Sequence, residues 1–276
     1  MTAKSVEKSV EAAGTTFHVD DSGGDGVPIV ALHSLFLDSR MFDEFTSAAQ
    51  GDFRVIRPDF RGQGRSAPAT GAVVTIEQNA GDIAAVLDRM GIERAHILAS
   101  SMGGDVAIRL AAMRPDVVLS LAFLGSSARP EPPEQLDAFR AWVDEAAEHG
   151  FTAERLDFVV QIMFGESTRT DPAMRDSLAR WRQRFAELPT SLKPAMLGVV
   201  VRHDGVPLLA DIDAPALVLS GEECPVRPPE WAHELADGLR HAELVMLPKV
   251  GHSPLLEAPV VTTERVLTFF RSHNPT

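Results

Sequence analysis

Short apolar runs alternate with helical patterns along most of this chain, and this alternation constrains the fold more than any other sequence feature. Several runs, such as Ile29–Leu32, are apolar at every position, which is typical of strands covered by helices on both faces. We predict strands at Thr16–Val19, Ile29–Leu32, Phe53–Arg57, Ala95–Ala99, Leu119–Leu124, Ala216–Ser220 and Glu243–Leu247. Helices are predicted at Ile76–Met90, Gly103–Met113, Pro229–Gly238 and Pro259–Ser272. The alternation indicates an α/β protein with a doubly wound, mostly parallel sheet, in which ligands bind beyond the carboxyl ends of the strands.

The region between Arg129 and about Pro207 departs from this pattern. Prolines 130, 132 and 133 open a stretch with no clear strand. Helical patterns follow at Glu134–Glu148, Ala153–Phe164, Pro172–Glu187 and Leu192–Arg202. We therefore predict a core formed by residues 1–128 and 207–276, with a helical insertion at residues 129–206. Helical spacing does not separate side chains that line a site from those that pack helices together, so Trp142 is a candidate for either role.

A serine lies where a predicted strand turns into a predicted helix. The chain there reads His96-Ile97-Leu98-Ala99-Ser100-Ser101-Met102-Gly103-Gly104. Small residues on such a sharp turn hold a serine above the carboxyl end of a sheet, as in the G-x-S-x-G nucleophile elbow, here with Ala99 in the first glycine position. Ser100 also carries a hydroxyl, but the two following glycines favour Ser101 as the nucleophile. The motif alone leaves open a Gly/Ser-rich turn without chemistry.

Three further segments follow predicted strands in a fixed order. They are His33-Ser34-Leu35-Phe36, Asp59–Ser66 and Gly251-His252-Ser253-Pro254. Together with the turn at Ser101, these segments resemble the α/β-hydrolase superfamily over nearly the whole chain. In that superfamily a helical insertion after the sixth strand forms a lid over the active site, so the resemblance implies that residues 129–206 are a lid.

The resemblance also implies roles for individual residues. His252 would be the base that removes the proton of Ser101, because a serine hydroxyl alone is a poor nucleophile. The backbone N–H groups of Met102 and Leu35 would form the oxyanion hole. Ser34 stands where the superfamily usually has glycine. Its hydroxyl either binds substrate or belongs to a tolerated small side chain.

Two loops near the amino-terminal half carry further motifs. The segment Ser34–Phe42 is similar to the equivalent loop of 3-oxoadipate enol-lactone hydrolases. In that loop, Arg40 either binds a substrate carboxylate through its planar fork or braces the loop itself. The turn Asp59–Ser66 resembles the superfamily pattern D-x-R-G-x-G-x-S, and we expect its role to be structural.

The acid of a Ser-His-acid triad is missing from both positions where the superfamily places it. After the strand that ends at Ser220 the chain reads Gly221-Glu222-Glu223-Cys224, which resembles G-x-x-D with Cys224 in place of the acid. The alternative position, after the preceding strand, reads Gly125-Ser126-Ser127. Loss of the acid costs on the order of 10⁴ in turnover, because the acid orients the histidine and stabilises the imidazolium.

Four interpretations of position 224 remain open. Glu223, or else Glu222, serves as a substitute acid, or Cys224 acts as a thiolate partner of His252. Alternatively, the residue at 224 was substituted deliberately, as is done to trap complexes, or the chain is a natural relative with weak or no activity. A protonated thiol is a weak hydrogen-bond acceptor, so the choice matters for the chemistry.

Composition restricts the partners of this chain. A formal net charge of −13 disfavours nucleic acid and anionic membrane, because both require a basic face. No stretch is long and apolar enough to span a bilayer, the first residues contain no apolar signal core, and Cys224 is the only cysteine. These features predict a cytoplasmic protein. Homo-oligomerisation is left open by the sequence.

These patterns predict a serine hydrolase that cleaves a small carboxylic ester or lactone through an acyl-enzyme on Ser101. We expect neither a metal nor an organic cofactor. A carbon–carbon bond hydrolase of ring-cleavage products would use the same residues. The missing acid favours a third possibility, a ligand-binding member of the fold with impaired turnover. The apolar insertion also fits a thioesterase or an epoxide hydrolase-like enzyme, although the latter normally needs an aspartate at position 101.

Overall fold

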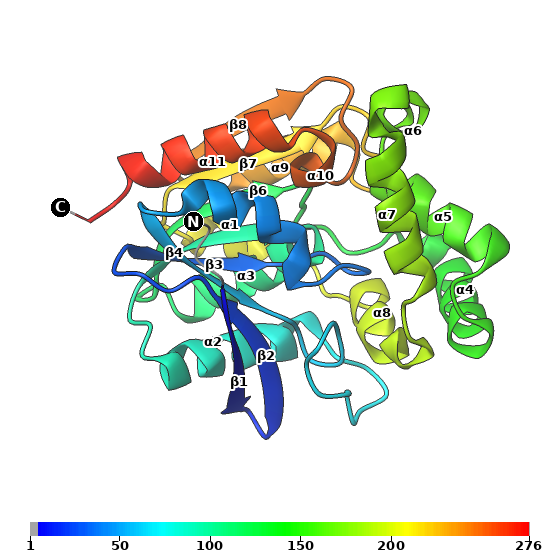
Figure 1. Ribbon diagram of the computed structural model, residues 1–276, viewed down its shortest axis with the longest axis horizontal. Helices are drawn as coiled ribbons and strands as arrows, with labels where there is room; N and C mark the ends of the chain where they lie inside the picture. Colours follow the sequence, from blue (N-terminus) through cyan, green and yellow to red (C-terminus); the bar gives the residue numbers. More distant parts are fainter. Residues whose placement is uncertain (1–4, 276) are drawn as a thin grey trace.

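The computed structural model describes residues 5–275, which form an eight-stranded sheet with helices around it (Figure 1). The strands are β1 (Val6–Ala12), β2 (Thr15–Asp21), β3 (Val27–Leu32), β4 (Phe53–Pro58), β5 (Ala95–Ser100), β6 (Val118–Leu124), β7 (Ala216–Gly221) and β8 (Ala242–Leu247). Their order in the sheet is β1-β2-β4-β3-β5-β6-β7-β8. Strand β2 pairs antiparallel with β1 and β4, and all pairs from β4 to β8 are parallel. The predicted doubly wound, mostly parallel α/β sheet is confirmed.

Strand β1 is absent from the sequence-based prediction. It lies at the edge of the sheet, and its polar residues Glu7, Lys8 and Glu11 leave no apolar run to recognise. Charged side chains are common on edge strands because they prevent pairing with other chains. The pattern that identifies buried central strands therefore fails at the edge.

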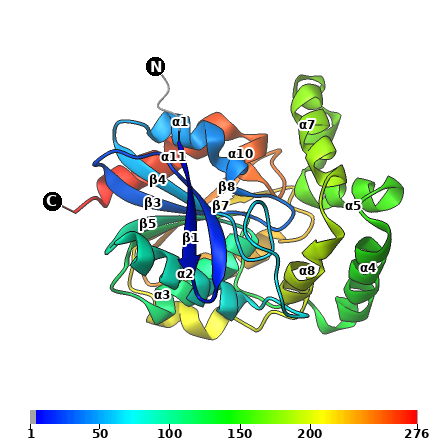
Figure 2. The same cartoon turned by 60° about the horizontal axis from the view of Figure 1, so that its bottom comes forward.

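Helices cover both faces of the sheet, which explains the uninterrupted apolar runs. Helices α2 (Ile76–Met90), α3 (Met102–Met113) and α9 (Pro229–Gly238) cover one face, and α1 (Asp43–Ala49) and α11 (Pro259–Ser272) cover the other (Figure 2). Every residue of β5 and β7 is buried between these layers. Each face of the sheet has its own apolar core, one with α2, α3 and α9 and one with α1 and α11.

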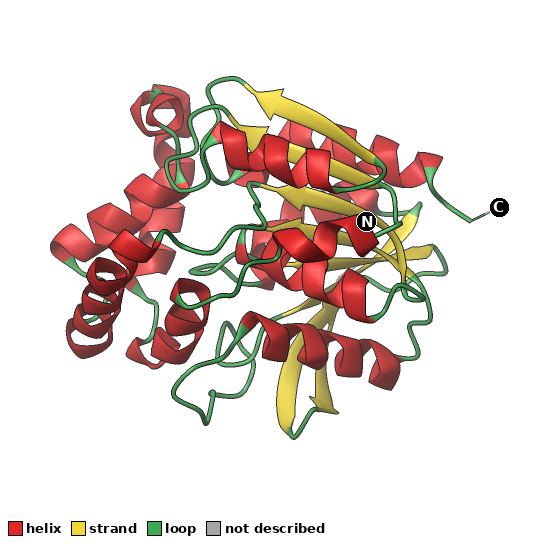
Figure 3. Ribbon diagram, turned by 180° about the vertical axis from the view of Figure 1, so that it is seen from behind, coloured by secondary structure: helices red, strands yellow, loops and turns green. Residues whose placement is uncertain are grey.

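A helical insertion separates β6 from β7 along the chain. It contains α4 (Leu136–His149), α5 (Ala153–Met163), α6 (Glu166–Thr170), α7 (Arg175–Ala186) and α8 (Lys193–Val200). Figure 3 shows these helices beyond the end of the sheet toward which the parallel strands point. The sequence predicted four of these helices; α6 and also α10 (Pro254–Glu257) are too short for a helical period to be recognised. Within residues 5–275, no helix has the length and apolar composition needed to cross a membrane.

Candidate active site

Ser101 lies on a strained turn between β5 and α3. Its backbone has φ 51° and ψ −112°, a conformation that residues other than glycine rarely adopt. The glycines that follow allow the helix to pack closely. A Cβ atom on Gly103 would lie 2.2 Å from the carbonyl oxygen of Leu32, and one on Gly104 would lie 2.2 Å from Ser126 Oγ. The small residues of the motif thus let α3 approach β3 and β6 while Ser101 stays at the carboxyl edge of the sheet.

The structure brings Ser101, His252 and Cys224 together from three separate loops. His252 Nε2 lies 2.7 Å from Ser101 Oγ, and His252 Nδ1 lies 3.2 Å from Cys224 Sγ. All three side chains are buried. Position 224 therefore stands where the acid of a Ser-His-acid triad would meet the histidine.

Both the histidine and the thiol are uncharged near neutral pH. Burial lowers the pKa of His252 to about 3, and the positive charges of Arg227 and Arg202 act in the same direction. Burial also raises the pKa of the Cys224 thiol to about 11. A thiolate partner for His252 is consequently disfavoured at neutral pH.

A neutral thiol permits two proton arrangements on His252. If Sγ–H donates to Nδ1, the proton of the imidazole is on Nε2, and Nε2 cannot accept the proton of Ser101. If Nδ1–H donates to Sγ, then Nε2 is free to act as a base. A carboxylate accepts only, so it would enforce the second arrangement. Cys224 Sγ also accepts the backbone N–H of Arg227 at 3.3 Å, which favours its acceptor role without enforcing it.

The structure does not bring the two neighbouring glutamates to His252. Glu223 accepts hydrogen bonds from the backbone N–H of Ser167, at 2.7 Å, and from Ser167 Oγ, at 2.5 Å. These bonds lower the pKa of Glu223 and direct its carboxylate to the helical insertion. Glu222 is exposed on the same turn. The side chain on Nδ1 of His252 is that of Cys224.

The loop with the second expected oxyanion donor is braced by His33. The Nε2 atom of His33 accepts the backbone N–H of Phe60 at 3.0 Å, so Nδ1 carries the proton and donates to the Ser34 carbonyl at 2.8 Å. This bond orients the peptide group that contains the Leu35 N–H. Among the described residues, the buried Ser34 Oγ has no hydrogen-bond partner, and Ser34 lines the same cavity as Ser101.

A cavity of about 660 Å³ opens above Ser101 and His252, between the insertion and the core. Its wall is mostly apolar, with Trp142 among the aromatic residues that line it. Trp142 also packs on other rings, with centroids 5.2 Å from Phe158 and 6.0 Å from Phe36. Trp142 therefore lines the cavity and also packs against neighbouring aromatic side chains. In the described part of the chain, no group of three His, Cys, Asp or Glu side chains is arranged to hold a metal ion.

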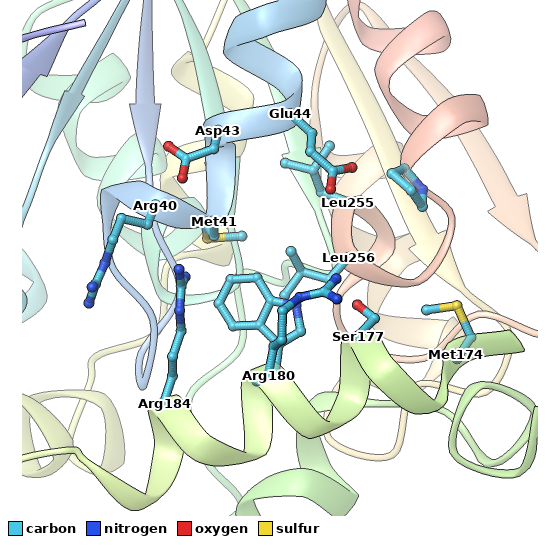
Figure 4. A pocket seen from close by; sticks show the side chains of 12 residues that line it. Arg40, Met41, Asp43, Glu44, Met174, Ser177, Arg180, Arg184, Leu255 and Leu256 are labelled. Carbon is cyan, nitrogen blue, oxygen red and sulfur yellow. The ribbon is translucent and has the colours of Figure 1, made fainter. Parts of the chain in front are cut away.

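Arg40 lies outside this cavity. Its guanidinium pairs with Asp38, with Nε 2.9 and 3.0 Å from the two carboxylate oxygens. Arg40 lines a separate pocket of about 310 Å³. Figure 4 shows its side chain across from Arg180 and Arg184 of α7. The structure thus brings Arg40 to the surface between α7 and the core, where it braces its own loop, and not to Ser101.

A buried cluster of charges beside the cavity was missed by sequence reasoning. Arg227 Nη1 lies 3.3 Å from Glu131, and Arg227 Nη2 lies 3.7 Å from Asp105. Arg202 Nε lies 3.5 Å from the same Asp105, and Arg202 also pairs with Glu131. Although burial opposes ionisation, the two arginines hold the pKa of Glu131 below its ordinary value. These residues come from four separate segments, so no local motif could have found them.

Comparison with known proteins agrees with this geometry. Residues 27–259 match the family described as alpha/beta hydrolase fold. The chain is 27% identical over 246 residues to a 2-hydroxy-6-oxononadienedioate/2-hydroxy-6-oxononatrienedioate hydrolase of Paraburkholderia xenovorans, covering 85% of this chain and 83% of the relative.

Two solved structures are similar over nearly their whole length. A thermophilic esterase from Thermogutta terrifontis has a TM-score of 0.88 and 27% identity, covering 98% of this chain and 100% of that one. The enol-lactonase from Burkholderia xenovorans LB400 has a TM-score of 0.86 and 29% identity, covering 96% and 100%. With the family match spanning most of the sequence, and with a strained serine turn at the carboxyl edge of a mostly parallel sheet, the chain belongs to the α/β-hydrolase fold family.

Proposed function

We propose that this hydrolase cleaves a small carboxylic ester or lactone through an acyl-enzyme on Ser101. The observation that carries the proposal is the 2.7 Å contact between Ser101 Oγ and His252 Nε2, at the base of a cavity. In the tautomer with Nδ1–H on Cys224, His252 removes the proton of Ser101 as Oγ attacks the carbonyl carbon. His252 then returns that proton to the leaving oxygen, and water cleaves the acyl-enzyme by the same route in reverse.

The oxyanion formed in each step needs preorganised donors. We assign this role to the backbone N–H groups of Met102, at the start of α3, and Leu35, in the loop braced by His33. The close packing of Gly103 against Leu32 supports the assignment, because it holds these two segments together. The hydroxyl of Ser34, which has no partner among the described residues, is available to a substrate oxygen.

We further propose that residues 129–206 form a lid on a core of residues 1–128 and 207–276. Residues from α4, α5 and α8 line the cavity together with Ser101 and His252. The mostly apolar lining suits the hydrocarbon part of an ester or lactone. The lining residues Glu131 and Arg227 place polar groups in one part of this wall.

Two alternatives have specific support. The Paraburkholderia xenovorans relative is named a 2-hydroxy-6-oxononadienedioate/2-hydroxy-6-oxononatrienedioate hydrolase, and hydrolysis of a carbon–carbon bond in a ring-cleavage product would use the same serine and histidine. The second alternative is a ligand-binding protein with little turnover. Its support is that His252 Nδ1 contacts the neutral thiol of Cys224 instead of a carboxylate.

The test is hydrolysis of a short aryl ester, together with covalent labelling of Ser101 by a fluorophosphonate. We expect the protein to label and to hydrolyse the ester slowly, and Ser101→Ala to do neither. Labelling without ester turnover would shift the assignment to another carbonyl substrate, such as a ring-cleavage product. A folded protein that neither labels nor turns over would support the ligand-binding alternative.

A further inference from the structure

The carboxylate of Glu257, at the end of α10, is surrounded by hydrogen-bond donors from two parts of the molecule. Its Oε1 accepts the backbone N–H of Ser253 at 2.8 Å, and its Oε2 accepts that of Gly251 at 2.9 Å. These are the two residues that flank His252. Oε2 also accepts the Gly165 N–H, at 2.8 Å, and Thr168 Oγ1, at 2.7 Å. One side chain thus joins both sides of the histidine to the helical insertion.

A second carboxylate contacts the same part of the insertion. Glu223, next to Cys224, binds the N–H and hydroxyl of Ser167. The hydroxyl of Ser253 donates to the Met163 carbonyl at 2.7 Å and closes the same interface. The segment Gly165–Thr168 therefore touches the loop of His252 through Glu257 and the loop of Cys224 through Glu223.

The packing around this segment leaves little room for adjustment. A Cβ atom on Gly251 would lie 2.1 Å from the backbone nitrogen of Gly165, and one on Gly165 would lie 2.9 Å from Gly251 N and from Glu223 Oε2. Hydrogen bonds to an ionised carboxylate are short and strong compared with bonds between neutral groups. Undocking the segment would leave the carboxylate with only its bonds to the histidine loop, so the two loops and the insertion are coupled.

We propose that Glu257 is the positioning residue for His252, and that Glu257 and Glu223 make the alignment of Ser101, His252 and Cys224 depend on the docking of Gly165–Thr168. This inference rests on the proposed function for its catalytic consequence. It assigns to the insertion a task beyond covering the cavity: the insertion holds the histidine loop in register with the serine. Glu257 does not line the cavity, so its effect should fall on the chemical step and not on substrate binding.

The experiment compares three substitutions in the full-length chain. Glu257→Gln leaves one accepting oxygen, so one side of the carboxylate clamp is lost. Thr168→Val removes only the hydroxyl donor on the insertion side. Glu264→Gln is the control. Glu264 is exposed on α11, so this substitution removes the same charge without affecting the contacts of Glu257. We would measure ester kcat and KM, the rate of fluorophosphonate labelling, and amide hydrogen exchange in residues 163–168 and 250–253.

We expect Glu257→Gln to lower kcat and the labelling rate by roughly 10- to 100-fold with KM within about twofold, because small misplacements of catalytic groups have effects of this size. Thr168→Val should lower both severalfold and speed exchange of the Gly251 amide, which shares Oε2 with Thr168. Rates for Glu257→Gln equal to those of Glu264→Gln would overturn the proposal, as would unchanged exchange at Gly251 in Thr168→Val.

Hydrogen exchange keeps this inference separate from the proposed function. If the unaltered protein neither labels nor turns over, the proposed function fails, while faster exchange at residues 251 and 253 in the variants would still support the clamp. If Glu257→Gln does not fold, Thr168→Val alone decides, because it removes a single hydroxyl and leaves the carboxylate in place.

Discussion

We expect replacement of Cys224 with aspartate to accelerate the proposed ester hydrolysis. Cys224 Sγ already lies 3.2 Å from His252 Nδ1, and an aspartate carboxylate at this position would accept from Nδ1–H. Supplying a missing triad acid is worth up to about 10⁴ in turnover, or roughly 5 kcal/mol of transition-state stabilisation. The new charge would be buried, but the positive charge of Arg227 and the backbone N–H that Arg227 donates to Sγ would offset part of that cost. We therefore expect kcat to rise by about 10²- to 10⁴-fold.

The pH dependence gives this prediction a second readout. The pKa of His252 is lowered to about 3, so kcat/KM of the unaltered protein should show no loss of activity between about pH 8 and pH 5 from histidine protonation. A carboxylate on Nδ1 favours the imidazolium and raises this pKa, so Cys224→Asp should lose activity on acidification at a higher pH. Cys224→Asn is the matched control: its carbonyl can orient the same tautomer without a charge, and it should recover only a small part of the gain.

The assay is hydrolysis of a short aryl ester by the three proteins across this pH range, with circular dichroism to show that each is folded. A folded Cys224→Asp protein that is no faster than Cys224→Asn would refute the reasoning. That result would mean that the thiol already suffices, or that the residue at 224 is not what limits His252.

Three further predictions concern stability and specificity. The pKa of His252 is about 3 in the folded state and about 6.5 in the unfolded chain. Between these values the unfolded chain binds more protons than the folded protein. The free energy of unfolding should therefore fall by up to about 1.4 kcal/mol per pH unit on acidification from pH 6.5 toward 3. His252→Asn should remove this contribution in urea titrations, and an unchanged slope would contradict it. Gly103→Ala, whose Cβ would lie 2.2 Å from the Leu32 carbonyl oxygen, should destabilise the protein by about 1–3 kcal/mol. Gly81→Ala, on α2 with open space around it, should instead stabilise the protein by about 0.5–1 kcal/mol. Equal effects of the two substitutions in thermal unfolding would argue against the close packing of Gly103. Arg40→Ala should change kcat/KM by less than about twofold for neutral and carboxylate-bearing esters alike, because Arg40 pairs with Asp38 and lies outside the cavity above Ser101. Selective loss of the carboxylate-bearing ester would show that Arg40 binds substrate.

The fold was predictable because its signals are local. Apolar runs such as Ile29–Leu32 and the small residues around Ser101 follow from the burial of central strands and the tightness of one turn. The edge strand β1 was missed because most of its residues are polar or exposed and leave no apolar run. Short helices such as α6 and α10 were missed because they are much shorter than the window of about 11 residues over which a helical period is recognised.

The site could be predicted only in part. The sequence suggested Ser101, His252 and the anomaly at Cys224, because each follows a strand whose end lies at one edge of the sheet. It gave no means to choose between Cys224 and Glu223 as the partner of His252, since adjacent residues on a turn point in different directions.

By itself, then, the sequence determined the alternation of central strands and long helices, the sharp turn at Ser101 and the absence of a carboxylate at position 224, because these depend on neighbouring residues. Only the tertiary structure decided that Glu223 binds Ser167, that Arg40 faces a different pocket, and that Glu257 holds both sides of His252. These contacts join residues far apart in the chain or join a side chain to backbone N–H groups. Backbone donors are present at almost every residue, so no sequence pattern indicates which of them a carboxylate will meet.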